Sequence, residues 1–446
     1  MLKKVLFRGD QRTVKAKKNI IASIFLKGFD GIIYLLLVPV TLGYLNQYEY
    51  GIWLTLSSIL MWINSFDIGL GNGMRNKLAT AIAKENYELG RSYVSTTFFM
   101  LVLLMGGLIM IGSIINPFIN WYSILNTKET VVPHLNQIVY IAFFIFCINF
   151  IFKFIGNVYL ALQLPSVNNL LVVSGNGLAL ISVFILTKTT SSSLLYVAVA
   201  YSLSPLTIYL LSYPVTFKLR YPRLAPSFRY FKRRYLKDLF NIGIQFFILQ
   251  ISGILMFSIT NLVISHMFGP AQVTPYNISY RYLSVMIMFS NLVMAPMWSA
   301  TTDAYVKGDI QWIETTNKKI QRFLIFITIG LLLMVVVSKW IYKIWIGSSV
   351  TIPLSLTLMM AVYDAVILWS LSYSVFLNGF GKLRLQTIMA ILMAVLIIPL
   401  SYVCGRRLGI IGIVGLLCLF HSIALIINKI QFDKLICNRA YGVWDK

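Results

Sequence analysis

Charged side chains inside long apolar segments are the residues of this chain that could do chemistry. Lys27, Asp30, Lys153, Arg281 and Asp364 each lie within such a segment. A charge at the centre of a membrane-spanning helix costs roughly 2.5–3.5 kcal/mol, so ions of this kind are found mainly where they bind a substrate, a coupling ion or each other. These five positions are therefore the candidate binding residues.

A polar stripe runs along the first apolar segment and contains Asp30. At about 100° per residue of helix, its members fall within an arc of about 60°. They are Ser23, Lys27, Asp30, Tyr34 and Thr41. Such a stripe predicts a helix face that avoids lipid. Asp30 is a candidate coupling-ion site, and a structural ion pair with Lys27, three residues away, is the alternative.

Asp364 is the second candidate for a coupling-ion site. It lies near the middle of its apolar segment, on one side of the helix with Thr357 and Asn378. A carboxyl group buried at this depth could take up and release a proton near neutral pH. Coupling to H⁺ or Na⁺ is one interpretation, and pairing with a basic residue on another helix is the other.

The intramembrane cations suggest an anionic cargo. Arg281 shares a face with Asn277, and its guanidinium fork matches two oxygens of a diphosphate or acidic sugar. Lys153 shares a face with Asn149 and Asn157. Snorkelling of the long side chain to the membrane surface is the alternative for Arg281 and Lys153. The predicted substrate-binding residues are Arg281, Lys27, Lys153 and Asn277.

The composition identifies the elements that must position these residues. The chain has 446 residues, of which 58% are hydrophobic and 12% charged, with a net charge of +24. So little polar surface indicates an integral membrane protein. The basic residues are spread over short loops, so the charge predicts attraction to anionic membrane lipid and no nucleic-acid partner.

Twelve segments are long and apolar enough to cross about 30 Å of hydrocarbon. They cover residues 19–44, 49–70, 92–115, 135–160, 168–187, 194–217, 239–268, 275–299, 323–346, 353–378, 385–404 and 408–428. The last two are separated by a short Gly-Arg-Arg turn. We predict a loop between residues 71 and 91, with the glycine-rich stretch 69–73 ending the second helix in a tight turn.

The distribution of Lys and Arg predicts the orientation. Placing both termini in the cytoplasm puts 29 of the 38 basic residues on that side, against six on or near the outer side. The segment 218–238 contributes eight of the 29. Because cytoplasmic loops collect Lys and Arg, this difference predicts cytoplasmic termini and a cytoplasmic central loop.

The predicted fold is an all-α integral membrane protein with twelve transmembrane helices in two six-helix bundles. The domains are an N-terminal tail and bundle (1–217), a basic cytoplasmic loop (218–238), a C-terminal bundle (239–428) and a cytoplasmic tail (429–446). Weak similarities between the halves recur at an offset close to 223 residues. An even number of spans per half predicts a pseudo-twofold axis along the membrane normal, with a substrate path between the bundles.

Three short motifs and the span layout carry a resemblance to a known family. The segment 48–53 (YEYGIW), followed by 67–70 (DIGL) and Asn76, resembles the first two spans of bacterial polysaccharide flippases of the Wzx type. The similarity extends to 377–382 (LNGFGK) after the tenth span. These flippases belong to the multidrug/oligosaccharidyl-lipid/polysaccharide exporter superfamily, which also contains multidrug exporters of the MATE type.

The resemblance implies a function and a location. It implies bundles that form a V around a cation-lined lumen. It also implies transfer of undecaprenyl-diphosphate-linked oligosaccharide from the inner to the outer leaflet of the bacterial inner membrane, for O-antigen, capsule or exopolysaccharide synthesis. Candidate partners are a polysaccharide polymerase and a chain-length regulator. No cofactor or enzymatic activity is expected.

Two other classes of protein compete with this interpretation. A drug or metabolite exporter on the same fold would favour carboxylates for cationic cargo, whereas three intramembrane cations here face two carboxylates. A membrane enzyme of polysaccharide assembly would need a reactive surface outside the membrane, and the longest outer loop, 116–133, has none. His134, His266 and His421 are far apart in sequence, so no metal site is predicted.

Overall fold

The computed structural model describes residues 11–65, 70–236, 258–294 and 297–445, and these ranges contain helices and turns but no strand. The helices form two compact units, Met1–Ile251 (unit 1) and Ser252–Lys446 (unit 2). Eight helices in the described ranges are long and apolar enough to cross a membrane, which makes the chain a multi-pass membrane protein.

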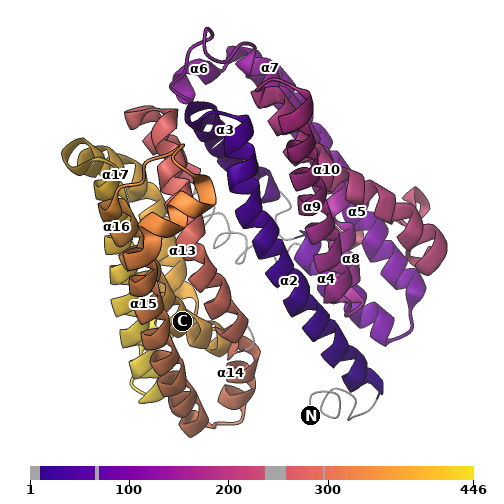
Figure 1. The fold of residues 1–446 in the computed structure, drawn as a ribbon. Coiled ribbons are helices and arrows are strands. Elements are labelled where there is room, and N and C mark those ends of the chain that lie inside the picture. The colour runs from indigo at the N-terminus through magenta and orange to yellow at the C-terminus, as the bar shows by residue number, and fades with distance from the viewer. Residues whose placement is uncertain (1–10, 66–69, 237–257, 295–296, 446) are drawn as a thin grey trace. The chain divides into compact units, whose positions relative to one another are not determined.

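Unit 1 contains the α-helices shown in indigo to magenta in Figure 1. They are α2 (Gln11–Tyr44), α3 (Gln47–Leu60), α4 (Leu70–Ala83), α5 (Tyr87–Ile115), α6 (Trp121–Ile124), α7 (Leu135–Lys153), α8 (Ile155–Ala161), α9 (Pro165–Thr189) and α10 (Leu194–Pro214). Short 3-10 turns follow as η1 (Met61–Ser65), η2 (Asn116–Phe118), η4 (Pro222–Leu224) and η5 (Phe228–Tyr230), and η3 (Val215–Arg220) is a π-helical turn.

Small residues bring three helices of unit 1 close together. α9 packs against both α2 and α10. A Cβ on Gly177 would lie 3.6 Å from Ile33 of α2, and one on Gly175 would lie 3.0 Å from the backbone of Pro205 of α10. Glycine at position 175 therefore permits the near approach of the α9 and α10 backbones that is typical of membrane bundles, whereas the contact at Gly177 is an ordinary one.

One predicted loop of unit 1 is a helix. The predicted turn at 69–73 and loop at 71–91 are wrong for residues 70–83, because α4 occupies them, and for residues 87–91, which begin α5. Its apolar residues Leu70, Met74 and Leu78 recur every four positions and are fully buried. They pack with Ile155 and Val158 of α8 in one hydrophobic cluster. The turn comes later, at Glu85, whose φ of 55° is left-handed.

Unit 2 contains a helix at 258–268 and five named α-helices, orange to yellow in Figure 1. They are α13 (Val273–Met294), α14 (Met297–Val306), α15 (Ile310–Ile346), α16 (Leu354–Phe380) and α17 (Arg384–Ile436), with short turns η6 (Pro270–Gln272) and η7 (Gly442–Asp445). α16 is the central helix, because it packs against α13, α14, α15 and α17.

The 53 residues of α17 are two helices joined at a break. Gly409 has φ 63° and ψ −152°. This backbone conformation is not helical, and residues other than glycine rarely adopt it. The break lies two residues beyond the predicted Gly-Arg-Arg turn, so the eleventh and twelfth predicted segments are separate helices.

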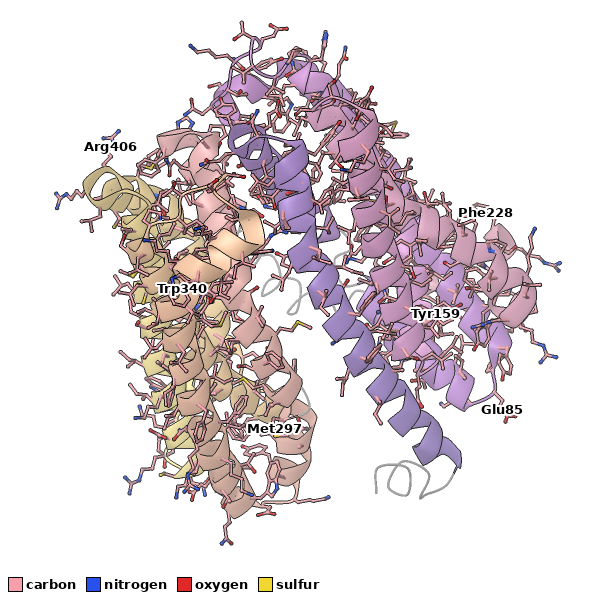
Figure 2. All side chains as sticks on the ribbon, viewed as in Figure 1. Glu85, Tyr159, Phe228, Met297, Trp340 and Arg406 are labelled. Atoms are coloured by element: carbon pink, nitrogen blue, oxygen red, sulfur yellow. The ribbon has the colours of Figure 1, made fainter. Side chains whose placement is uncertain are left out.

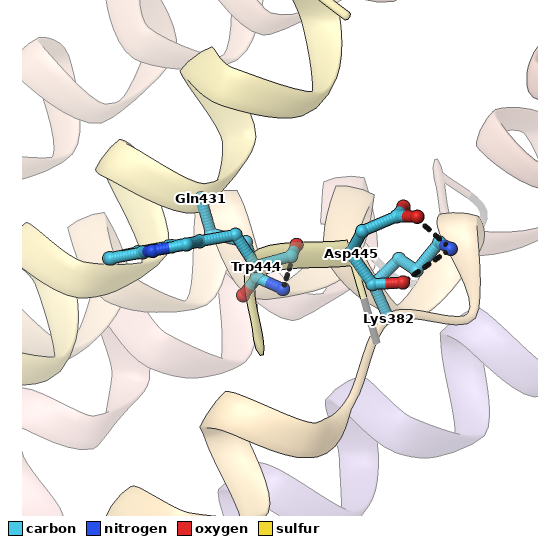
Figure 3. A network of polar contacts seen from close by, with 4 residues as sticks. All are labelled: Lys382, Gln431, Trp444 and Asp445. Atoms are coloured by element: carbon cyan, nitrogen blue, oxygen red, sulfur yellow. Dashed lines mark hydrogen bonds and ion pairs between the residues drawn. The ribbon is translucent and has the colours of Figure 1, made fainter. Parts of the chain in front are cut away.

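The residues after α17 are fastened to the turn between α16 and α17. Lys382 Nζ lies 2.8 Å from Asp445 Oδ1 and also donates to the Asp445 carbonyl at 2.8 Å. Gln431 Nε2 donates to the carbonyl of Trp444 at 3.1 Å, as Figure 3 shows. The LNGFGK motif therefore has a local structural role: Gly381 (φ 72°) ends α16, and Lys382 holds η7.

Candidate functional site

The most deeply buried charged residue of the described chain is Asp364, on the central helix of unit 2. Its side chain has 0% exposure. Neither carboxylate oxygen has a hydrogen-bond partner within the described part of the chain. A buried polar group without a partner costs free energy that the fold must offset elsewhere, so its presence suggests a function.

The helices around Asp364 supply a polar lining. Tyr276 of α13 is fully buried, lies within electrostatic range of Asp364 and shares a hydrogen bond with Thr260. Asn277 Nδ2 donates to Asn261 Oδ1 at 2.9 Å, linking α13 to the helix 258–268. All four of these surrounding side chains are buried. The carboxyl group thus lies in a polar region inside an otherwise apolar unit.

Two further titratable groups lie near Asp364. Tyr363 precedes it on α16 and is also within its electrostatic range. The ring of Tyr363 lies 5.5 Å from that of His421 on the second half of α17. We call these residues the acidic cluster: Asp364, Tyr276, Tyr363 and His421. The cluster brings together groups that can hold or pass a proton.

The acidic cluster can accommodate a proton or a small cation. A carboxylate and nearby phenol oxygens are hard donors, which suit H⁺ or an alkali or alkaline-earth ion. The described residues contain no group of three or more His, Cys, Asp or Glu side chains that could hold a metal ion. A site with one carboxylate fits a singly charged ion best.

Asp30 in unit 1 has a different environment. It is half-buried on α2, and Asn176 Nδ2 of α9 donates to its Oδ1 at 2.8 Å. Lys27 is exposed, and these two described residues form no ion pair. The Lys27–Asp30 ion pair considered as the alternative is therefore not formed, and Asp30 instead links α2 to α9. Thr41 of the stripe is buried and hydrogen-bonds Tyr201 at 2.7 Å.

The predicted substrate-binding residues are divided between the two units. Lys153 is exposed at the last residue of α7, and Phe154 interrupts the helix before Asn157. In unit 2, Arg281 is half-buried on α13, and Ser284 Oγ donates to its carbonyl at 2.8 Å. Asn277 is 3% exposed, so its amide connects helices within unit 2.

Several residues of the acidic cluster were not predicted as site residues. Tyr276, Tyr363 and His421 come from α13, α16 and α17. Tyr276 precedes Asn277 and Tyr363 precedes Asp364, but adjacent helical residues point about 100° apart, so a single-face analysis excludes them. His421 has no candidate partner close in sequence, because its neighbour Tyr363 is 58 positions away.

A cavity of about 240 Å³ in unit 1 is of a different kind. It lies between α3, η1, α5 and α7, and most of its lining is apolar, including Leu56, Ile111 and Phe143. Its polar atoms are few: the Trp121 indole donates to Asn116 at 2.8 Å. Such a cavity suits hydrocarbon and offers little to a sugar or an ion.

The fold of this chain is shared with membrane transport proteins of known structure. The structure is similar to a multidrug resistance MATE family transporter of the MOP superfamily in its inward-facing conformation, with TM-score 0.76, 16% identity, and 94% and 98% of the two chains covered. It is also similar to a MOP superfamily transporter from Pyrococcus furiosus, with TM-score 0.62, 17% identity and 98% of each chain covered. At these identities the similarity shows the fold.

The sequence comparisons then give the family. Residues 16–301 match the polysaccharide biosynthesis protein family, and the chain belongs to it. A proposed O-antigen export protein of Yersinia pseudotuberculosis is 22% identical over 395 residues, covering 86% of this chain and 88% of that protein. A proposed O-antigen transporter of Salmonella typhi is 22% identical over 445 residues, covering 95% and 96%. The resemblance to polysaccharide flippases of the Wzx type is confirmed.

Proposed function

We propose that this protein is a flippase for undecaprenyl-diphosphate-linked oligosaccharide repeat units. It would move them from the inner to the outer leaflet of the bacterial inner membrane, for the synthesis of a cell-surface polysaccharide. The family match and the two relatives, both named for O-antigen export or transport, support this proposal. Transport would need no catalytic group and no organic cofactor.

The proposed mechanism is alternating access. Twelve spans form two six-helix bundles that rock around a path between them, with the sugar and diphosphate in the path and the lipid tail in the bilayer. Arg281, Lys27 and Lys153 are the proposed contacts for diphosphate or acidic sugar, because cations bind such groups through charge-assisted hydrogen bonds. Asn277 is better suited to holding Arg281's helix in place, given its bond to Asn261.

Ion coupling through Asp364 is the second part of the proposal. The observation that supports it is full burial together with two carboxylate oxygens that lack hydrogen bonds from the described residues. Binding of H⁺ or Na⁺ would neutralise this group, and release would restore its charge. The free energy of the carboxyl group therefore depends on ion occupancy, which is the differential interaction that a coupled conformational change requires.

A drug or metabolite exporter of the MATE type is the second candidate function. The similarity to the multidrug transporter fold favours it, although a shared fold does not give a shared cargo. The two functions differ in the expected charge of the cargo. An exporter of cations would depend on its carboxylates for cargo binding, whereas the flippase would depend on Arg281.

The deciding experiment locates the lipid-linked sugar in a strain from which the gene is deleted. The flippase proposal predicts accumulation on the inner leaflet and loss of surface polysaccharide, both restored by the wild-type gene. Arg281→Ala should abolish restoration although the protein inserts normally. Accumulation on the outer leaflet, or unchanged surface polysaccharide with altered drug resistance, would favour the exporter.

A further inference from the structure

The central basic segment is a folded surface on unit 1. Residues 218–234, which we call the basic platform, are held against the start of α5 by three hydrogen bonds. Ser95 Oγ accepts from the backbone N–H of Ser227 at 3.0 Å, and Thr96 Oγ1 accepts from the backbone N–H of Lys232 at 3.0 Å. Arg91 Nε donates to the carbonyl of Ala225 at 2.9 Å. These bonds fix the platform to the end of a transmembrane helix.

Packing supports the same attachment. Leu224 is 1% exposed and belongs to the hydrophobic cluster that includes Leu78 and Val94. The guanidinium of Arg91 lies 4.4 Å from the ring centre of Tyr230, a cation–π contact. The side chains of Leu224 and Tyr230 thus hold the platform against unit 1, and the charged side chains lie on its outer side.

The platform carries seven basic and no acidic residues. Lys218, Arg220, Arg223, Arg229, Arg233 and Arg234 are exposed, and Lys232 is half-buried. Among the described residues, none of these seven cations forms an ion pair with a carboxylate, although Glu85 and Glu88 are exposed near the start of α5. The positive charge is therefore not neutralised by the described residues of unit 1.

Large apolar side chains project among these cations. Leu219 is 77% exposed and lies between Lys218 and Arg220, and Phe228 is 74% exposed and precedes Arg229 (Figure 2). Phe228 rests on Phe231, with ring centroids 6.0 Å apart and planes inclined by 5°. An exposed aromatic ring held by a stacked neighbour loses little conformational freedom on binding, so it is suited to insertion into an apolar medium.

We propose that the basic platform binds the headgroups of anionic phospholipids in the cytoplasmic leaflet. Clustered Lys and Arg next to a span attract anionic lipid several-fold per cation, and Phe and Leu insert at the boundary between headgroups and acyl chains. The platform begins within four residues of the end of α10, which is where headgroups lie in the predicted orientation. This inference concerns the attachment of unit 1 to the bilayer and is independent of the cargo.

The test measures lipid selectivity of the purified full-length protein. It is reconstituted in phosphatidylcholine vesicles that contain a trace of spin-labelled phosphatidylglycerol or spin-labelled phosphatidylcholine. The ratio of the two motionally restricted fractions gives the preference for the anionic lipid. We expect a preference that Arg229→Gln/Arg233→Gln lowers on the order of tenfold, because two interfacial cations are lost. Added salt should lower it in the wild type as well.

The matched control is Lys318→Gln/Lys319→Gln. It removes the same charge from two exposed adjacent cations of α15, which belongs to unit 2 and has them on the same predicted side of the membrane. Phe228→Ser keeps every charge and removes the inserting ring, so it should weaken the preference by a smaller factor. Size-exclusion profiles of all variants verify folding.

Two outcomes would overturn the proposal. Equal loss of preference in the platform and control variants would mean that only net charge matters. An unchanged preference in Arg229→Gln/Arg233→Gln, together with binding of soluble polyglutamate to the wild type alone, would assign the platform to an acidic protein partner. Neither outcome affects the flippase proposal, because transport is not measured.

Discussion

The two carboxylates that the sequence places inside apolar spans have different environments in the two units. Asp30 lies on α2, which packs chiefly against α9, and it is half-buried with a hydrogen bond from Asn176 at 2.8 Å. Asp364 lies on α16, which four helices surround, and it is fully buried without a hydrogen bond from the described residues. Both belong to the same residue type and both were predicted as coupling sites.

The position of the helix explains the difference. A side chain on a peripheral helix can keep contact with water or with one polar neighbour, and then its charge costs little. A side chain on the central helix of a unit has no contact with water, so its ionised form has a high free energy. Binding of an ion neutralises the carboxylate and lowers that free energy. We therefore propose that coupling rests on Asp364 and that Asp30 has a structural role through its bond to Asn176.

The largest predicted effect separates these two roles by transport. Asp364→Asn keeps the shape of the side chain and removes its ability to ionise, so we expect surface polysaccharide to fall by about 100-fold if one coupling step is lost. Asp30→Asn keeps an oxygen acceptor for Asn176 and should lower export by less than about threefold. Complementation of a deletion strain, with protein level measured in the membrane fraction, gives the comparison. Equal losses would remove the distinction.

A second prediction concerns stability, where the two variants should shift in opposite directions. Asp364→Val removes two buried oxygens without partners, whereas Asp30→Val leaves the Asn176 amide without its acceptor. The free energies of unfolding should differ by roughly 2–4 kcal/mol, with Asp364→Val the more stable. Both substitutions introduce the same β-branched residue into a helix, so propensity cancels.

Melting temperatures in detergent, followed by intrinsic fluorescence, give the sign of each shift. A lower melting temperature for Asp364→Val than for wild type would mean that the carboxyl group is bonded and structural. Loss of export in a variant that is more stable than wild type would be strong support for a functional role, because function then explains a residue that stability disfavours.

Apolar length predicted much of the helical content, whereas the orientation predicted from the basic-residue bias stays a prediction. Most predicted spans in the described ranges coincide with a helix, because period and length are local properties. The second, 49–70, does not, since α3 ends at Leu60 and the turn η1 follows. Residues 239–257 of the seventh lie outside the described residues. α4 was missed because its glycines suggested a turn, although Leu70, Met74 and Leu78 follow a helical period. The break at Gly409 was predicted two residues early, since Arg406 and Arg407 suggest a turn equally well.

The candidate site was less predictable, for a physical reason. Asp364 could be singled out, since a lone acid in an apolar run is a local anomaly. Its burial depends on α16 being the central helix of unit 2, and the Asn261–Asn277 bond and the Tyr363–His421 contact join different helices. Helix neighbours are tertiary information that periodicity within one segment does not contain.

The smallest predicted effect compares how tightly the two units are packed. A Cβ on Gly379 of α16 would lie 2.7 Å from Cβ and Cγ2 of Thr301 on α14, whereas one on Gly177 of α9 would lie an ordinary 3.6 Å from Ile33. Gly379→Ala should therefore destabilise the protein by about 1–3 kcal/mol, as overpacking does. Gly177→Ala should be neutral or slightly stabilising, because alanine favours the helix and nothing has to move.

A third variant tests whether the contact with Thr301 is the cause. Thr301→Ser removes Cγ2, one of the two atoms that the new methyl group would meet, so Gly379→Ala/Thr301→Ser should recover part of the lost melting temperature. The Cβ of residue 301 and the carbonyl of Trp298, 3.1 Å away, remain and should keep recovery incomplete. If the melting temperature did not recover at all, the strain would come from the close approach of the α14 and α16 backbones and not from the Thr301 methyl group. Equal shifts for Gly379→Ala and Gly177→Ala would show that the central helix of unit 2 is no more tightly packed than the peripheral contact in unit 1.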